Sequence, residues 1–380
     1  MEVTITAKIR LYPTLEQVQQ LDACATAYTR AATSVSQAES NSKDRTKAKK
    51  IQDKHYQEIR DRYGLKSQQA CSVCKTVAAA NKSIQSNKHT QAKTPEFKHA
   101  FYEAVRGRDY TLKDTEISLN TLEEKRVKIP YTVTPQHAEL LKHGKLGTAK
   151  VFKRHNKHYM HIPVTIEVND PEEYRDGETI IVGIDRGIRF LMTCYDSLGK
   201  TTFFSGKEVL EKRKQYKAKR SELQKKGTPS ARRRLKEMGS RENRWMSDVN
   251  HCLSKTLVET YPTGTIFVLE DLSGIRGSLV TARRNERYER VSWAYADLET
   301  KLRYKAKRAG QRVVLVDPAF SSQECPKCGH VAKENRDKHS HRFECVECGY
   351  SSNDDRTAAM VLFERGRMKV LAELEEHASS

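Results

Sequence analysis

The stretch Ile180-Ile-Val-Gly-Ile-Asp185 is apolar up to its last residue, which is an acid. A second stretch of the same kind, Ile266-Phe-Val-Leu-Glu270, follows later in the chain. Short apolar runs of this length are typical of strands that are buried on both faces. Burying a carboxylate is costly unless it is paired or bound to a cation, so such acids are rarely placed there for stability. Asp185 and Glu270 are therefore candidate functional residues.

The order of the elements around these two strands predicts a fold class. The first acid-tipped strand is followed by short strands at 189–195 and 201–204, then by helices, then by the second acid-tipped strand. A last helix, predicted at about 354–376, begins beside Asp355 and carries Ala358-Ala359, whose small side chains would let it lie close to a sheet. This order of strands and helices is that of an RNase H-like fold.

Three carboxylates converge in an RNase H-like fold. Asp185, Glu270 and Asp355 would hold two divalent metals about 4 Å apart, which activate water and stabilise the leaving oxygen of a phosphodiester. Because all the ligands are oxygens, Mg²⁺ or Mn²⁺ is favoured. The spacing alone also allows a simpler interpretation, in which the three are unrelated surface or capping acids. Of the neighbouring acids, Asp271 turns to the opposite side by strand alternation, and Asp354, with Ser352 and Asn353, is a natural N-cap.

Four cysteines form a metal-binding pattern in the C-terminal part. Cys325 and Cys328 make one C-x₂-C pair, Cys345 and Cys348 make a second, and a glycine follows each pair. Four thiolates at this spacing predict a tetrahedral structural Zn²⁺ site, a zinc ribbon. The alternative of two disulfides fits poorly with an odd total of nine cysteines, which favours a reducing intracellular compartment.

The first 170 residues predict a β-rich part with helices inserted into it. Residues 2–11 form a predicted strand, and Thr14 with Gln17 makes a capping box that starts an amphipathic helix. Alternating apolar residues predict a half-buried strand at 159–168, and Pro163 within it predicts an edge strand. These patterns indicate a small β-barrel or sheet that is interrupted by a helical insertion.

The chain is strongly basic, and its charge is unevenly distributed. It has 69 Lys and Arg against 49 Asp and Glu in 380 residues, a net charge of +20. The segment 207–244 carries fifteen basic and five acidic residues, a difference of +10, on two predicted helices separated at Gly227-Thr-Pro229. This excess favours contact with phosphate backbones, which gives affinity without sequence readout. The simpler interpretation is a solvated helical face.

Membrane and secreted proteins are excluded by the same sequence. No run of about 18 apolar residues is present, so neither a spanning helix nor a membrane partner is expected. The N-terminus alternates polar and apolar residues and lacks the apolar block of a signal peptide. We therefore expect a cytoplasmic protein.

Seven short motifs carry a resemblance to a known family. They are Arg10-Leu-Tyr-Pro-Thr14 with Gln17, Gly183-Ile-Asp-Arg-Gly187, Val268-Leu-Glu-Asp-Leu272, Tyr304-Lys-Ala-Lys307, Ser321-Ser-Gln-Glu-Cys-Pro-Lys-Cys-Gly329, Cys345-Val-Glu-Cys-Gly349 and Asp355-Arg-Thr-Ala-Ala359. Together, and in this order, they resemble the transposon-encoded TnpB family, RNA-guided DNA endonucleases related to type V CRISPR effectors. The resemblance covers nearly the whole chain.

The resemblance implies an α/β and β multidomain architecture. A wedge-type β-barrel would comprise 1–13 and 93–172, with a helical recognition insertion at 14–92. An RNase H-like RuvC nuclease domain would occupy 173–322 and 351–380, with the zinc ribbon inserted at 323–350.

The resemblance also implies the residues and partners of the activity. Asp185, Glu270 and Asp355 match the three RuvC acids of the family, and Thr357 stands where the family commonly has Asn, which leaves the triad intact. The implied partners are a guide RNA from the transposon end and target double-stranded DNA, bound by a monomer at the nucleoid of a prokaryotic cell. Base pairing would then supply the sequence specificity.

We therefore predict an RNA-guided DNA endonuclease that uses two-metal catalysis, and two alternatives stay open. The first is a transposase that joins strands with a 3′-hydroxyl in place of water. Against it, Glu270 ends a strand, whereas transposases of the DDE type place their Glu on a late helix. The second is an RNA-guided DNA-binding protein that does not cleave.

Overall fold

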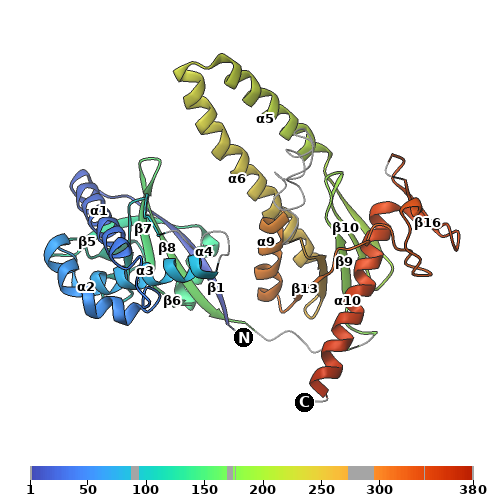
Figure 1. Ribbon diagram of the computed structural model, residues 1–380, viewed down its shortest axis with the longest axis horizontal. Helices are drawn as coiled ribbons and strands as arrows, with labels where there is room; N and C mark the ends of the chain where they lie inside the picture. The colour runs from blue at the N-terminus through green and yellow to red at the C-terminus, as the bar shows by residue number, and fades with distance from the viewer. Residues whose placement is uncertain are drawn as a thin grey trace. The chain divides into compact units, whose positions relative to one another are not determined.

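The computed structural model describes residues 2–86, 94–168, 174–175, 177–272, 295–337 and 339–378. It divides the chain into two compact units, 2–167 and 168–380 (Figure 1). None of the helices in the described residues is long and apolar enough to cross a membrane.

The N-terminal unit consists of an eight-stranded sheet and four helices. Its strands are β1 (Glu2–Leu11), β2 (Phe101–Ala104), β3 (Tyr110–Leu112), β4 (Glu116–Leu119), β5 (Val127–Thr132), β6 (Lys145–Leu146), β7 (Ala149–Arg154) and β8 (Lys157–Glu167). Its helices are α1 (Leu15–Ala38), α2 (Ala48–Tyr63), α3 (Ser67–Ser86) and α4 (Pro135–His143). The predicted first strand and the capping box of Thr14 and Gln17 are both present.

The sheet of this unit curls into a nearly closed barrel. Its strand order is β2-β7-β8-β1-β5-β4-β3, with β6 also paired to β8. The two outermost strands, β2 and β3, are consecutive in the chain and are joined only by residues 105–109, which keeps the two edges close. Helices α1 to α3 share one buried core with the sheet, to which Tyr28 and Val73 contribute from the helices and Ile9 and Met160 from the strands.

The prediction of an edge strand from Pro163 is wrong, because β8 lies inside the sheet between β7 and β1. Pro163 stands opposite the interruption between β6 and β7, where its carbonyl accepts a hydrogen bond from the Gly147 N–H at 2.8 Å. The N and C=O of a strand residue point to the same side, so the missing N–H also faces this interruption. A central strand therefore tolerates the proline here.

The C-terminal unit is built on a five-stranded sheet of order β11-β10-β9-β12-β13. The strands are β9 (Ile181–Asp185), β10 (Phe190–Asp196), β11 (Thr201–Ser205), β12 (Ile266–Glu270) and β13 (Arg312–Val316). Strand β10 is antiparallel to both β9 and β11, whereas β12 runs parallel to both β9 and β13. Both acid-tipped strands are thus present, and they lie side by side.

Helices cover the two faces of this sheet. On one face, α6 (Pro229–Thr260) and α9 (Tyr295–Arg308) pack through Leu257 and Leu298 against Val182 and Phe267 of the strands. On the other face, α10 (Asp354–Ala378) packs through residues such as Leu362, and Figure 1 shows it crossing β9 and β10. Strand alternation explains this division, because successive side chains point to opposite faces.

Two further parts project from the sheet. Helix α5 (Lys207–Lys226) and α6 form a long hairpin (Figure 1), and the predicted break between them is confirmed. Gly227 ends α5 with a φ of 61°, and the Thr228 hydroxyl caps α6 by accepting from the Ala231 N–H. The segment 325–353, called the cysteine ribbon below, forms a small sheet of β14 (Arg336–Asp337), β15 (Arg342–Glu344) and β16 (Ser351–Asn353).

Candidate functional site

Asp185 and Glu270 lie at the same edge of the C-terminal sheet. Strands β9 and β12 are parallel neighbours, and Ile184 is in register with Leu269. The next residue on each strand is the acid, so both carboxylates leave the sheet at its carboxyl end. Each of the two side chains is half-buried.

Arg186, directly after β9, connects the carboxyl ends of β9 and β12. Its side chain is fully buried, and its guanidinium donates a hydrogen bond to the main-chain carbonyl of Glu270. It also pairs with the Glu299 carboxylate of α9 at 3.5 Å. This residue was not predicted from the sequence. The signal for it was a charged side chain directly after a buried strand, where a partner is required.

Ser321 contacts the Glu270 side chain directly. Its hydroxyl donates a hydrogen bond to Glu270 Oε1 at 2.8 Å, and only 4% of the residue is exposed. One carboxylate oxygen of Glu270 is therefore held in place by Ser321. Ser321 belongs to the motif that contains the first cysteine pair, but no role was predicted for it.

Asp355 comes to the site on the first turn of α10, and glycine contacts set the position of that helix. A Cβ added to Gly183 of β9 would lie 2.1 Å from the Ala359 carbonyl oxygen, and one added to Gly366 would lie 2.2 Å from Val268 Cγ2. The helix therefore lies against the sheet with almost no space between them. Asp355 is one helical turn before Ala359, and Asp185 is two residues after Gly183, on the same strand face.

The charges of the three acids interact. Burial raises the pKa of Asp185 well above its usual value, and the nearby carboxylates of Glu270 and Asp355 raise it further. Burial also raises the pKa of Asp355, and the charge of Asp354 adds to this increase. Burial and mutual repulsion both disfavour the charged carboxylates, and a bound divalent cation would favour them.

The three predicted acids do not form one compact group of ligand atoms in the described residues. Among the described residues, two groups bring their ligand atoms within 4.8 Å of one another: the four ribbon cysteines, and His341 with Asp354 and Asp355. Asp185 and Glu270 do not join Asp355 at that distance.

Asp354 has a different environment from Asp355, and of the three predicted capping residues, Ser352, Asn353 and Asp354, it is not the one that caps α10. The cap of α10 is Asn353, whose side-chain Oδ1 accepts from the Arg356 N–H at 3.0 Å. The Asp354 side chain is fully buried and accepts a hydrogen bond from Arg336 Nε at 3.0 Å. The sequence could not indicate this pairing, because Arg336 reaches α10 only after the cysteine ribbon folds back.

The four ribbon cysteines have the geometry of a metal site. Sγ of Cys325 lies 3.6 Å from Sγ of Cys348, and Sγ of Cys328 lies 3.6 Å from Sγ of Cys345. A tetrahedral Zn²⁺ with Zn–S bonds of about 2.3 Å places its sulfurs about 3.8 Å apart, whereas a disulfide needs about 2.05 Å. The cluster is therefore compatible with a structural zinc, and none of these cysteines forms a disulfide.

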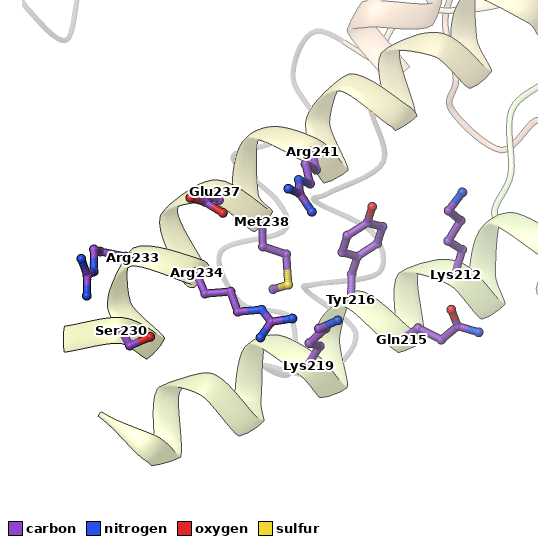
Figure 2. A pocket seen from close by; sticks show the side chains of 10 residues that line it. All are labelled: Lys212, Gln215, Tyr216, Lys219, Ser230, Arg233, Arg234, Glu237, Met238 and Arg241. Carbon is purple, nitrogen blue, oxygen red and sulfur yellow. The ribbon is translucent and has the colours of Figure 1, made fainter. Parts of the chain in front are cut away.

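The α5–α6 hairpin contains a basic groove of about 730 Å³. Figure 2 shows its lining side chains, which include five cationic groups and one acid: Lys212, Lys219, Arg233, Arg234, Arg241 and Glu237. Tyr216 also lines the groove and packs against the Trp245 ring, with centroids 6.2 Å apart. Cations beside a half-buried aromatic ring suit the phosphates and bases of a nucleic acid.

Two family models match separate parts of the chain. Residues 161–273 match the family described as "Probable transposase" (OrfB of IS605), and residues 295–362 match the "Cas12f1-like, TNB domain". The first match runs from within β8 to just beyond β12, and the second contains α9, the cysteine ribbon and the start of α10.

Three named relatives agree with these matches. The CRISPR-associated endodeoxyribonuclease Cas12f1 of Syntrophomonas palmitatica is 28% identical over 58% of this chain and 45% of its own length. The TnpB-like protein MJ0751 of Methanocaldococcus jannaschii is 25% identical over 68% of this chain and 93% of its own length. The "Putative RNA-guided DNA endonuclease InsQ" of Escherichia coli K12 is 25% identical over 59% of this chain and 57% of its own length.

The fold is similar to that of a Cas12f1 in a complex with sgRNA and target DNA. The TM-score is 0.61 at 13% identity, and the match covers 95% of this chain and 98% of that one. The chain spans about half the length of the curated Cas12f1 relatives that it matches. It is thus a relative of the TnpB-like proteins and of the Cas12f1 endodeoxyribonucleases, as the motifs in its sequence predict.

Proposed function

We propose that this protein is an RNA-guided DNA endonuclease whose catalytic residues are Asp185, Glu270 and Asp355. The observation that carries the proposal is the interaction of the Asp185 carboxylate with both of the others, at the carboxyl end of two parallel strands. The names of the relatives supply the reaction class, since they include endodeoxyribonucleases and an RNA-guided DNA endonuclease.

The site would work by hydrolysis at a pair of divalent cations. Mg²⁺ or Mn²⁺ bound there would activate water and stabilise the leaving oxygen of the phosphodiester. Asp185, Glu270 and Asp355 would hold the cations, and Ser321 would keep one Glu270 oxygen turned away from them. Arg186 would keep Glu270 beside Asp185 by holding its main-chain carbonyl.

The domain assignment that accompanies this function is also a proposal. Unit 168–380 would hold the RuvC domain (173–322 and 351–380) with the zinc ribbon at 323–350 inserted. Its strand order, three antiparallel strands followed by two parallel ones, supports an RNase H-like domain. Unit 2–167 would be the wedge-type β-barrel (1–13 and 93–172) with the recognition insertion at 14–92.

A guide RNA and target double-stranded DNA are the proposed partners, bound by a single copy of the chain. The basic groove between α5 and α6 supports this proposal, because its cations can neutralise phosphates without reading sequence. Base pairing with the RNA would then select the DNA.

The decisive experiment uses the full-length protein purified with RNA from its native locus. The bound RNA is sequenced, and a duplex matching its guide segment is offered with Mg²⁺. We expect cleavage by the wild type and none by Asp185→Ala or Glu270→Ala, with RNA binding kept in both. Asp317→Asn is the matched control, since Asp317 follows the neighbouring strand β13 and its carboxylate accepts from the Ala319 N–H in its own turn.

The same assay separates the alternatives. Joined DNA ends in place of free ones would identify a strand-joining transposase. Binding of the matched duplex without metal-dependent nicking would identify a non-cleaving protein. Full cleavage by Asp185→Ala would remove the catalytic assignment.

A further inference from the structure

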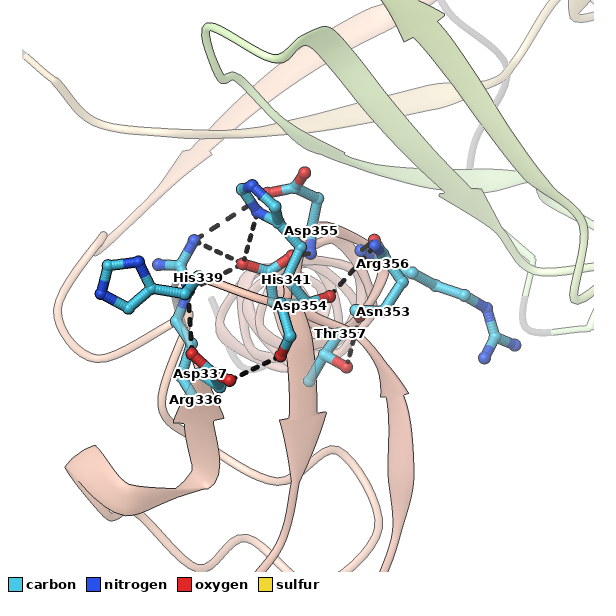
Figure 3. Close-up of polar contacts among 10 residues, drawn as sticks. Arg336, Asp337, His339, His341, Asn353, Asp354, Asp355, Arg356 and Thr357 are labelled. Carbon is cyan, nitrogen blue, oxygen red and sulfur yellow. Dashed lines mark hydrogen bonds and ion pairs between the residues drawn. The ribbon is translucent and has the colours of Figure 1, made fainter.

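A network of charged side chains connects the cysteine ribbon to the start of α10. Figure 3 shows Arg336, His341, Asp354 and Asp355 grouped at the N-terminal end of this helix. Arg336 begins β14, His341 directly precedes β15, and the two acids are the first residues of α10. The network therefore joins two parts of the unit that are separate in sequence.

Asp354 is the centre of this network. Its Oδ2 lies 3.0 Å from Arg336 Nε, 2.9 Å from Arg336 Nη2 and 3.5 Å from His341 Nδ1. Its Oδ1 accepts a hydrogen bond from the Asp355 main-chain N–H at 3.0 Å. The side chain is 0% exposed, so breaking its pairing with Arg336 would leave a buried charge uncompensated. Asp354 consequently holds Arg336 and the backbone of Asp355 in one fixed arrangement.

The turn before β15 reinforces this arrangement. The main-chain carbonyl of His341 accepts from the Asp354 N–H at 3.2 Å and from Asn353 Nδ2 at 3.4 Å. His341 has a φ of 54°, in the left-handed region that costs a non-glycine residue on the order of 1 kcal/mol. This backbone conformation aims both the carbonyl and the ring of His341 at Asp354.

The other end of the network reaches both cysteine pairs through Asn335. This residue is 1% exposed and directly precedes Arg336. Its Nδ2 donates to the main-chain carbonyls of Gln323 at 2.9 Å and His330 at 3.2 Å, on either side of the first pair. Its Oδ1 accepts from the Val346 N–H at 3.0 Å, within the second pair. The backbone around both cysteine pairs is thus hydrogen-bonded to the side chain of Asn335, the residue before Arg336.

We propose that Asp354 is a positioning residue for Asp355. Through Arg336 it fastens the first turn of α10 to the cysteine ribbon, so that the Asp355 carboxylate stays directed toward Asp185. This inference rests on the proposed function, because it takes Asp355 as a ligand of a divalent cation. Asp354 is assigned the positioning role because Arg336 and the Asp355 N–H already contact its two oxygens. Groups that orient a metal ligand in this way typically change metal affinity or activity by about 10–100-fold when replaced.

The test compares Asp354→Asn with Glu344→Gln in the full-length protein. Glu344 is an exposed acid on β15 of the same small sheet, so its replacement makes the same change of charge outside the network. The Mn²⁺ affinity of each variant is measured by electron paramagnetic resonance titration, and zinc content and RNA affinity are measured in parallel. We expect Asp354→Asn to raise the Kd for Mn²⁺ about tenfold, and cleavage to recover at saturating Mn²⁺. Glu344→Gln should match the wild type.

Two results would overturn the proposal. One is an unchanged Mn²⁺ affinity in Asp354→Asn. The other is a loss of zinc or of RNA binding that parallels the loss of Mn²⁺, because that pattern belongs to general unfolding. If Asp354→Asn does not fold, Arg336→Lys replaces it, since lysine keeps the charge but lacks the planar fork. If Arg336→Lys binds Mn²⁺ with the same Kd as the wild type, the proposal is likewise overturned.

An Asp185→Ala arm separates this proposal from the proposed function. If the wild type binds Mn²⁺ that Asp185→Ala does not bind, yet cleaves no DNA, the nuclease assignment fails and the titration of Asp354→Asn still decides the positioning role. If the wild type and Asp185→Ala bind Mn²⁺ equally, the carboxylates hold no cation, and both proposals fail.

Discussion

Gly183 of β9 lies directly against the carbonyl group of Ala359 of α10. A Cβ at Gly183 would be 2.1 Å from that oxygen and 2.5 Å from the Phe363 main-chain nitrogen. Because both atoms belong to the backbone, no side-chain rotation could relieve the overlap. The absence of a single methyl group therefore sets how closely the helix that carries Asp355 approaches the strand that ends at Asp185.

Replacing Gly183 with alanine should push α10 away from the sheet. Overpacking of this kind costs about 1–3 kcal/mol, and the shift should also reduce cleavage because it moves Asp355. Thermal unfolding and the cleavage rate test this. Gly239→Ala in α6 is the control: a Cβ there meets nothing within 4 Å, so it should raise stability by roughly 0.5–1 kcal/mol. Equal melting temperatures for Gly183→Ala and the wild type would show that Gly183 does not determine how closely α10 packs on β9.

Removing the Ser321 hydroxyl should impair the proposed chemistry without unfolding the protein. Ser321→Ala deletes the hydrogen bond to Glu270 Oε1 and leaves that carboxylate free to rotate. We expect cleavage to slow about tenfold, the lower end of the range for groups that orient a metal ligand. RNA affinity should not change. The neighbouring Ser322→Ala is the control, and equal rates for the two variants would show that Ser321 does not position Glu270.

Loss of one ribbon thiolate should release the zinc. Cys345→Ser leaves three sulfurs for the cation, so we expect the zinc content of the full-length protein to fall from about one per chain toward zero, because structural sites need four ligands. Elemental analysis measures this directly. Cys252→Ser, which replaces an exposed cysteine on α6, should keep the zinc. A zinc-free wild type would rule out the ribbon assignment.

Charge reversal in the α5–α6 groove should weaken nucleic-acid binding in a salt-dependent way. Arg233 and Arg234 are exposed and line the groove. Replacing both with Glu should lower RNA or DNA affinity and reduce the slope of log K against log salt by about 0.7–0.9 for each phosphate that the groove no longer neutralises. Lys255→Glu, elsewhere on α6, is the control. Identical slopes for the double variant and the wild type would mean that the groove does not bind phosphates.

The Glu39 carboxylate should make the N-terminal unit sensitive to acid. Burial acts to raise its pKa, but hydrogen bonds from Ser42, His55 and Lys54 outweigh burial, and the pKa is lowered from its ordinary value of 4.5. A pKa that is lower in the folded state stabilises the protein above pH 4.5, and this stabilisation disappears as the pH falls through the folded-state value.

Glu39→Gln should therefore reduce the free energy of unfolding at pH 7 by about 1.5–3 kcal/mol, the range of a charged hydrogen bond, and this difference should narrow below pH 4. Thermal melting at both pH values measures it. Asp53→Asn breaks only the exposed pair with Lys49 and should have an effect of at most about 0.5 kcal/mol. A difference between Glu39→Gln and the wild type that does not depend on pH would contradict the assignment.

Local patterns were sufficient for much of the fold. The two acid-tipped strands, the capping box of Thr14, the break at Gly227 and the spacing of the cysteines are all present as predicted. Each depends on residues that are close in the chain, so periodicity and turn chemistry suffice to identify them. The Pro163 prediction failed because the edge of a sheet is defined by which strands pair, and pairing partners are distant in sequence.

By itself the sequence determined which side chains are available for chemistry: three acids at the ends of elements, four thiolates and a concentration of positive charge. The tertiary structure alone decided how they are held. It brought the charges of Glu270 and Asp355 to Asp185, gave the capping role to Asn353, and buried Asp354 against Arg336. The reason is physical: these interactions form only when β9, β12, α10 and the cysteine ribbon pack together, and packing between distant segments has no local pattern in the chain.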